Sequence, residues 1–558
     1  MAFVSLKFII FIAVVFAAYF IIPVNYRWLV LLAGSLTFYY LNSGLLLFVM
    51  AATAIITWGI GLWIDRIYRQ ETKYLSENEE YLSDRKELKK AVQKRSKSRA
   101  KLVMILGIVV SLLPLLYLKY GGFFLSILSG SGAAAGAAAG TSANALYGWL
   151  RFLGGVSGSK SLHMDSAGLL LPIGISFYTL QAISYVVDLY RRKTEADRNP
   201  LKFLLFMSFF PQIVQGPIPR HSKLAAQLYE GHKFDYHRLC MGVQLILWGF
   251  MKKMIVADRI SGPVIEIFDH YEKYTGLMIF LAAAMYGIQV YTDFSGGMDI
   301  ARGVAQVLGI ELDLNFRQPY FASSVEDFWR RWHITLGGWM REYVFYPLSL
   351  SKVLVKLGRK SRKIFGQYVG KRLPAFLSMF VVYLLVGFWH GAEWKYVVYG
   401  IWNGVFIMAG ILLGDVYARG KKLCGISDEQ FTWRLFQKMR TFAIVSVGRI
   451  LSRADTVHDS IEMLKLIPKK WYNLAFVVDG SLIDLGLDND NWILLGIAVI
   501  VLFIVDMLHE RNIGIREAIA KQNIVFRWLI YYAAFAALLI FGIYGPGYDA
   551  AGFIYEKF

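Results

Sequence analysis

Two histidines in aromatic-rich segments are the residues of this 558-residue chain best suited to do chemistry. His333 lies in EDFWRRWHITLGGWMREY, four residues after Trp329, and this spacing predicts that both share one helical face. His390 lies in GFWHGAEWKY, where Gly387 and Gly391 permit close backbone approach. A neutral imidazole among apolar neighbours is suited to proton transfer, because its ordinary pKa is about 6.5.

Each histidine segment also has a purely structural interpretation. Residues 324–343 are consistent with an interfacial helix whose arginines snorkel toward water while the histidine packs among apolar side chains. Residues 386–396 are consistent with two helices joined by a polar turn that reaches the surface. The residue pattern leaves these interpretations open.

Tyr286, Gln289 and Asp293 form a third polar group within an apolar stretch, spaced so that they lie along one helical stripe. A charged residue at mid-bilayer costs about 2.5–3.5 kcal/mol, so its presence requires a partner or a function. A hydrogen-bond network between helices is the structural alternative. The functional interpretation is that these residues support a nearby site.

The composition indicates that membrane helices position these residues. Apolar residues make up 56% of the chain, charged residues 18%, and the mean hydropathy is +0.45. This excludes a disordered chain and argues against an ordinary soluble enzyme. The net charge of +20 comes from short basic blocks between apolar runs, a pattern typical of membrane topology, so no nucleic-acid partner is expected. Cys240 and Cys424 lie too far apart for zinc spacing or a disulfide framework, and no metal site is predicted.

Apolar runs predict an all-α multi-pass membrane protein with about 11–14 transmembrane and re-entrant helices. The expected spans lie near residues 5–24, 28–43, 44–64, 102–120, 168–190, 239–257, 277–300, 374–389, 394–414, 441–451, 492–508 and 527–545, with 201–216 and 328–350 less regular. Residues 3–22 are interpreted as a permanent span rather than a signal peptide. Basic segments at 65–101, 351–374 and 418–440 predict cytoplasmic loops, which places the amino terminus outside.

A set of longer segments, taken in order, resembles the membrane-bound O-acyltransferase superfamily, and within it the bacterial alginate O-acetyltransferase membrane subunits. The segments are LPIGISFYTLQAISYVVDLYR (171–191), FFPQIVQGPIPR (209–220), WGFMKKMIVAD (248–258), YTDFSGGMDIARGVAQVLGIELDLNFRQPY (291–320), EDFWRRWHITLGGWMREYVFYPL (326–348) and GFWHGAEWKYVVYGIWNG (387–404). The ordered set is highly specific, whereas no single segment would be.

The resemblance implies that His333 and His390 are the catalytic residues. It also implies a helical bundle around a central funnel or pore, which an acyl donor enters from the cytoplasm and the acceptor from the opposite side. Further residues that would bind substrate or support the site are Trp329, Arg330, Trp332, Trp389, Asp293 and Ser295.

Charge pattern and resemblance together divide the chain into four parts. Residues 1–120 would hold the amino-terminal transmembrane helices with a basic cytoplasmic loop near 65–101, and residues 121–167 a flexible Gly/Ala-rich external loop. Residues 168–414 would form the O-acyltransferase catalytic core. Residues 415–558 would hold a cytoplasmic loop and the carboxy-terminal transmembrane helices.

The expected function is the transfer of an acyl group, most simply acetyl, from a cytoplasmic thioester donor for O-acetylation of an extracytoplasmic polysaccharide. Acyl transfer requires a base for the hydroxyl and a donor to the developing oxyanion. No Gly-x-Ser-x-Gly elbow is present, so a serine acyl-enzyme is disfavoured. Acetyl-CoA is the expected co-substrate, no tightly bound cofactor is expected, and the location would be a bacterial cytoplasmic membrane.

The resemblance also implies an extracytoplasmic acetyltransferase-type partner protein that completes the transfer to the polysaccharide. Two alternatives stay open. One is D-alanyl transfer to teichoic acid from an acyl carrier protein. The other is a proton-coupled secondary transporter, which would use histidine and aspartate side chains at mid-membrane.

Overall fold

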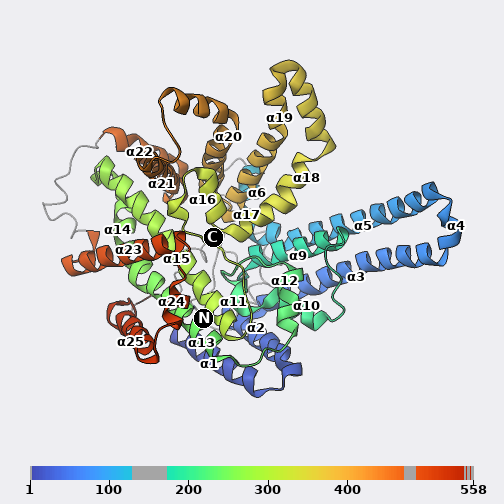
Figure 1. Cartoon of the computed structure of the whole chain (residues 1–558), viewed down its shortest axis with the longest axis horizontal. Helices are drawn as coiled ribbons and strands as arrows, with labels where there is room; N and C mark the ends of the chain where they lie inside the picture. The colour runs from blue at the N-terminus through green and yellow to red at the C-terminus, as the bar shows by residue number, and fades with distance from the viewer. Residues whose placement is uncertain (1–2, 129–171, 470–484, 546–547, 549–552, 554–558) are drawn as a thin grey trace. The chain divides into compact units, whose positions relative to one another are not determined.

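The computed structural model describes residues 3–128, 172–469, 485–545, 548 and 553, and Figure 1 shows that the regular elements in this part of the chain are helices. Most of the predicted external loop 121–167 lies outside the described residues. Among the described residues, eight helical stretches are long and apolar enough to cross a membrane: Val24–Glu77, Lys86–Phe124, Tyr236–Asp269, Gly276–Val307, Lys352–His390, Trp394–Leu423, Asn489–Glu510 and Ile524–Phe541. The prediction of an all-α multi-pass membrane protein is confirmed.

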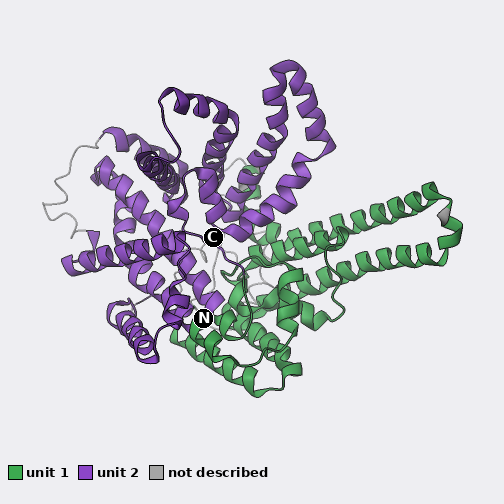
Figure 2. Ribbon diagram, viewed as in Figure 1, with its two compact units in different colours: residues 1–242, 304–312, 557 green, residues 243–303, 313–556, 558 purple. Residues whose placement is uncertain are grey.

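The chain forms two compact units, coloured separately in Figure 2. The first comprises residues 1–242 and 304–312, and the second comprises residues 243–303 and 313–556. The helices of the first unit are α1 (Leu6–Ile21), α2 (Arg27–Ser43), α3 (Leu47–Glu77), α4 (Glu79–Ser83), α5 (Lys86–Leu115), α6 (Gly121–Leu128), α9 (Ile175–Tyr190), α10 (Pro200–Ser208), α11 (Phe210–Ile213) and α12 (His221–Tyr229). Helix α13 (Tyr236–Met251) has residues in both units.

The basic segment 65–101, predicted as a cytoplasmic loop, is mainly helical. Helix α3 has 31 residues and α5 has 30, and they form the long arm seen in blue in Figure 1. At about 1.5 Å per residue, each helix is longer than the roughly 30 Å hydrocarbon layer. The polar half of each helix therefore extends beyond the hydrocarbon, where its exposed charged side chains are solvated.

Small residues let α3, α5 and α9 pack closely in the first unit. A Cβ atom at Gly61 of α3 would lie 2.7 Å from the Tyr185 ring of α9. A Cβ atom at Gly107 of α5 would lie 2.9 Å from Ile60 and 3.0 Å from Val186. Close approach at small residues is how membrane helices gain van der Waals contact without a hydrophobic driving force.

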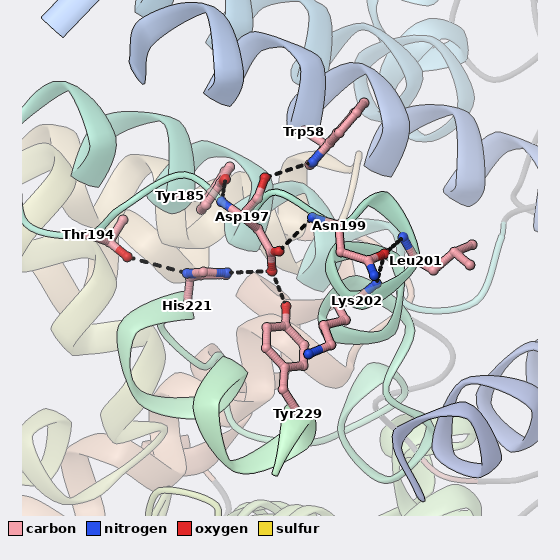
Figure 3. A network of polar contacts seen from close by, with 9 residues as sticks. All are labelled: Trp58, Tyr185, Thr194, Asp197, Asn199, Leu201, Lys202, His221 and Tyr229. Atoms are coloured by element: carbon pink, nitrogen blue, oxygen red, sulfur yellow. Dashed lines mark hydrogen bonds and ion pairs between the residues drawn. The ribbon is translucent and has the colours of Figure 1, made fainter. Parts of the chain in front are cut away.

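A polar network around Asp197 joins the connection after α9 to neighbouring helices (Figure 3). Its carboxylate accepts hydrogen bonds from the Tyr229 hydroxyl and, at 3.1 Å, from the Asn199 N–H, and it lies 3.5 Å from His221 Nε2. The Trp58 indole donates to the Asp197 carbonyl at 2.8 Å. Burial works to raise the pKa of Asp197, but the hydrogen bonds from His221 and Tyr229 outweigh it, so the pKa lies below its ordinary value.

The remaining described helices belong mainly to the second unit. They are α14 (Asp258–Asp269), α15 (Gly276–Val307), α16 (Val325–Arg331), α17 (Ile334–Met340), α18 (Tyr346–Ser349), α19 (Lys352–His390), α20 (Trp394–Leu423), α21 (Phe431–Arg453), α22 (Val457–Lys469), α23 (Asn489–Glu510), α24 (Ile515–Ala520) and α25 (Ile524–Phe541). Single π-helical turns occur at η4 (Lys252–Ala257) and η7 (Arg341–Phe345). The less regular segment 328–350 is broken into several of these short pieces.

The basic segment 351–374 is also helical. Helix α19 is interrupted at Gly366, whose φ of 81° and ψ of 172° suit glycine, and the chain reverses there into a hairpin of two arms. A Cβ atom at Gly358 on the first arm would lie 3.0 Å from the Gly370 carbonyl oxygen on the second. The second arm continues to His390, so this hairpin carries one of the predicted catalytic residues at its end.

Candidate active site

His333 lies in a break between the short helices α16 and α17. Its backbone is left-handed, with φ 45° and ψ 53°, a conformation that costs a residue with a side chain roughly 1–2 kcal/mol. The prediction that Trp329 and His333 share one helical face is therefore wrong. Helix α16 ends at Arg331, and the left-handed residue changes the direction of the chain before α17 begins.

The segment before α16 holds this break in place. Phe316 and Trp332 form an isolated antiparallel bridge. One step further along, the Ile334 N–H donates to the Asn315 carbonyl at 3.0 Å. His333 is thus enclosed between two points at which the backbone is tied down, which stabilises its strained conformation.

The His333 ring lies in a buried, mainly aromatic environment, with 1% of its surface exposed. Phe294 and Trp389 meet it edge to face, at ring-centroid distances of 5.0 and 5.4 Å. Its Nδ1 lies 3.4 Å from Asn315 Oδ1. Burial lowers the pKa of His333, which lies outside the eight candidate spans, to about 3, so its imidazole is neutral at neutral pH.

His390 ends α19 and is also buried. Its ring packs against Trp389 at 5.2 Å and against Tyr399 of α20 at 6.0 Å. The predicted close approach at Gly387 is present, since a Cβ atom there would lie 2.4 Å from the Tyr396 carbonyl oxygen. Trp389 therefore contacts both histidine rings and joins the two motifs, which lie 57 residues apart in the sequence.

Trp329 and Trp332 contact other residues of the second unit. The Trp329 indole donates to Asn403 of α20 at 3.2 Å. The Trp332 ring is fully buried, with the Arg449 guanidinium 4.5 Å above it. Arg330, in contrast, is exposed and forms an ion pair with a glutamate one turn earlier, so it is not part of the buried group.

Asp293 and Ser295 support the site indirectly, on either side of Phe294 in α15. The Asp293 carboxylate pairs with Lys253 at 2.7 Å, and the Ser295 hydroxyl accepts a hydrogen bond from Lys252 at 2.9 Å. Both lysines belong to the π-helical turn η4. These contacts fix the register of α15 and thereby the ring of Phe294, which packs on His333.

The residue pattern did not single out Asn315, Tyr399 or Arg449. Asn315 follows α15 in an irregular segment without periodicity, so no helical face relates it to His333. Arg449 is a basic residue inside an apolar run of α21, a signal that the sequence did contain. Its guanidinium donates to the Tyr399 hydroxyl at 3.2 Å, which places it between the two histidine motifs.

Fold and site define a multi-pass helical membrane protein with two buried histidines packed on one indole. The model of the membrane-bound O-acyltransferase family matches residues 191–420, which include both histidines. The match covers both histidine motifs, and the resemblance drawn from the sequence motifs is confirmed.

Curated relatives carry three activities. A probable alginate O-acetylase AlgI of Pseudomonas syringae pv. tomato is 32% identical over 52% of this chain and 50% of its own length. A peptidoglycan O-acetyltransferase of Helicobacter pylori is 27% identical over 71% of this chain and 70% of its own. A teichoic acid D-alanyltransferase of Streptococcus thermophilus is 27% identical over 46% of this chain and 59% of its own. The chain thus spans about half the length of the first of these relatives.

Proposed function

We propose that this protein is an O-acyltransferase that moves an acetyl group from a thioester donor toward a polysaccharide hydroxyl, with His333 and His390 as its catalytic residues. The observation that carries the proposal is the packing of both imidazoles on Trp389, at 5.4 and 5.2 Å. Both histidines lie within the region that matches the acyltransferase family.

In the proposed reaction, one imidazole takes the proton of the acceptor hydroxyl while the hydroxyl oxygen attacks the thioester carbonyl. The new carbon–oxygen bond forms, the carbon–sulfur bond breaks, and the proton passes from the imidazole to the leaving thiolate. The neutral form of His333 is the form that a base requires. A positioned base contributes about 10²–10⁴-fold to the rate, or roughly 3–5 kcal/mol of the barrier. The second imidazole would stabilise the oxyanion.

The proposed donor is acetyl-CoA from the cytoplasm. Its phosphates carry negative charge, and the first arm of the α19 hairpin presents the exposed basic residues Arg359, Lys360, Arg362 and Lys363. A concentrated positive potential at a cytoplasmic mouth would raise the local concentration of such a donor. The same residues would also fix membrane orientation. The KM for acetyl-CoA separates this role from donor binding.

The proposed acceptor is an extracytoplasmic polysaccharide, reached with the help of an extracytoplasmic acetyltransferase-type partner protein in a bacterial cytoplasmic membrane. The names of the alginate and peptidoglycan relatives support an O-acetylation reaction on a polymer. A polymer is too large and polar to enter a helical bundle, whereas an acetyl group is small. A partner that takes the acetyl group at the outer surface resolves this mismatch.

D-alanyl transfer from a carrier protein to teichoic acid is the second candidate function. The similarity to the Streptococcus thermophilus enzyme supports it, although that match covers less of this chain than the peptidoglycan O-acetyltransferase match. Both reactions use the same step, in which a hydroxyl attacks a thioester. The two candidates differ in donor and acceptor, which a purified system can supply separately.

The test uses the full chain, purified and reconstituted in proteoliposomes, with release of the donor thiol measured by a thiol reagent. We expect acetyl-CoA to be consumed when alginate is present and an extracytoplasmic acetyltransferase-type partner protein is added. The variants His333→Ala and His390→Ala should release no thiol above background. His270→Ala is the matched control, because that side chain is exposed. Consumption of a D-alanyl carrier thioester but not of acetyl-CoA would establish the second candidate instead.

A further inference from the structure

We propose that Asn315 is a positioning residue for His333, and that its side-chain carbonyl selects the tautomer in which Nδ1 carries the proton and Nε2 accepts one. The last step rests on the proposed function, because Nε2 is needed as a base only if His333 takes a proton from the acceptor. The observation behind the proposal is that two Thr335 donors and His333 Nδ1 converge on one oxygen atom, the side-chain carbonyl of Asn315.

Two of these groups are donors whatever the tautomer of His333. Asn315 Oδ1 accepts from the Thr335 N–H at 2.9 Å and from the Thr335 hydroxyl at 2.8 Å, and His333 Nδ1 lies 3.4 Å away. Asn315 itself is 1% exposed. A buried carbonyl oxygen with this many donors is a fixed acceptor, because bulk water does not compete for it.

The orientation of the amide follows from its second half. Asn315 Nδ2 donates to the Met298 sulfur at 3.4 Å, a weak acceptor. If the amide were flipped, its NH₂ group would face the Thr335 N–H, so two donors would meet in a buried place. The Asn315 Oδ1 atom is therefore held toward His333. A carbonyl oxygen can accept a hydrogen bond from Nδ1 but cannot donate one to it.

The tautomer follows from that geometry. A neutral imidazole has one N–H, and it is stabilised at the nitrogen that faces an acceptor. For His333 this nitrogen is Nδ1, so the lone pair lies on Nε2. Phe294 and Trp389 pack on the ring edge to face, and neither carries a charge that would compete with this acceptor.

The backbone of Asn315 gives a second, purely structural link to the same segment. Its carbonyl accepts from the Ile334 N–H at 3.0 Å, next to the left-handed residue His333. A substitution at position 315 leaves this backbone bond available while it changes the side-chain acceptor. The tautomer role can therefore be separated from the role in shaping the loop.

The test compares Asn315→Leu and Asn315→Asp in the proteoliposome assay, across a range of pH. Leucine is close in size but offers no acceptor, and we expect kcat to fall about 10–100-fold with little change in KM, the range typical of lost orienting partners. Aspartate keeps an acceptor oxygen, so we expect it to recover most of kcat. Its negative charge favours the protonated imidazole, so the acidic limb of the pH–rate profile should move to higher pH.

The charged and titratable groups on the elements that pack around His333 are the same in both Asn315 variants and in the wild type. They are the Lys253–Asp293 pair beside Phe294, Arg449 on Trp332, and His390 on Trp389. A shift of the pH profile therefore reports on position 315. Thr441→Val is the control for the loss of a buried hydrogen bond, since its hydroxyl donates within α21 at 2.7 Å. It should lower thermal stability without altering kcat or the profile.

Two results would overturn the proposal. One is an unchanged kcat in Asn315→Leu. The other is a parallel loss of activity and thermal stability in both variants with no movement of the pH profile, which would indicate a structural role only. If Asn315→Leu does not fold, the profile of Asn315→Asp decides alone. Wild-type protein and His333→Ala are measured alongside, because an inactive wild type refutes the proposed function, whereas unaffected Asn315 variants beside an inactive His333→Ala refute only this inference.

Discussion

Two polar clusters in the second unit differ in the residues that surround their titratable groups. The histidine cluster, His333, Trp389 and His390, holds its imidazoles against aromatic rings. The lysine cluster comprises Lys252, Lys253, Asp258, Asp293 and Asp299 and contains ion pairs of 2.6 to 2.8 Å.

The difference indicates what each cluster does. Opposite charges at contact distance satisfy one another, so the lysine cluster stabilises the packing of η4 against α15. Gly249 and Gly296 permit this contact, because a Cβ atom at Gly249 would lie 2.6 Å from the Gly296 carbonyl oxygen. The two imidazoles, in contrast, contact aromatic rings, and the neutral His333 is available for proton transfer. Changes in the histidine cluster should therefore affect activity, and changes in the lysine cluster should affect folding.

The largest expected effect is the loss of activity in His333→Ala and His390→Ala. Loss of a positioned base lowers kcat about 10²–10⁴-fold, and we expect the larger effect at His333. The amount of membrane-inserted protein and its thermal stability should change little, because one imidazole contributes little to a bundle of apolar helices. Activity and quantitative immunoblots of the membrane fraction measure both. A loss of protein equal to the loss of activity would contradict the assignment and indicate packed structural histidines.

The lysine cluster should respond in the opposite way. Lys253→Met leaves two carboxylates, Asp258 and Asp293, without their shared cation, and breaking a buried pair costs about 3–5 kcal/mol. We expect little folded protein in the membrane fraction. The double variant Lys253→Met with Asp293→Leu removes both members of the most buried pair and should recover part of it. Normal abundance of Lys253→Met with lost activity would place this cluster in the catalytic machinery.

The Asp197 network of the first unit provides a test by pH. Because the folded pKa of Asp197 lies below its unfolded value of about 3.9, its contribution to stability is present at neutral pH and is lost as the pH falls through the folded pKa. Asp197→Asn should lower the free energy of unfolding by about 1.5–3 kcal/mol at pH 7. The difference from wild type should shrink toward pH 3, as measured by thermal unfolding in detergent. A difference that does not depend on pH would show that the ionised carboxylate is not the stabilising group.

The smallest expected effect concerns the donor. Replacing Arg359, Lys360, Arg362 and Lys363 by glutamine should raise the KM for acetyl-CoA about 2–10-fold and leave kcat unchanged, because screened surface charges act on encounter rather than chemistry. The control replaces four exposed α5 residues, Lys86, Lys89, Lys90 and Lys94, with the same change in net charge. Equal KM values in the two variants would remove the α19 hairpin from the donor site.

Much of this architecture could be predicted from the sequence, because apolar runs of membrane length and their basic flanks are strong signals. The two histidine motifs were also visible as residue types. Their geometry was not, since it depends on the left-handed backbone at His333 and on the contact made by Trp389, both set by tertiary packing. Helical periodicity predicted that Trp329 and His333 share one face. The prediction failed because no local signal in the sequence marks the break between them.

The role of Asn315 was even less predictable from the sequence. Its backbone lies in an irregular segment, and its role depends on a pairing with residues 332–335 that no periodicity encodes. The basic segments 65–101 and 351–374 were recognised by charge as cytoplasmic loops, and both are mainly helical. Charge alone does not predict where helices begin and end within such a segment.

The most direct test of the central claim is acyl transfer across a sealed bilayer. Proteoliposomes would hold alginate and the extracytoplasmic partner inside and receive radiolabelled acetyl-CoA outside, and the label on the recovered polysaccharide would be measured. We expect labelled polysaccharide with wild-type protein and with His270→Ala, and none above background with His333→Ala or His390→Ala inserted at equal amounts. Labelling that persists in either histidine variant would contradict the assignment of the buried histidine pair as the catalytic centre.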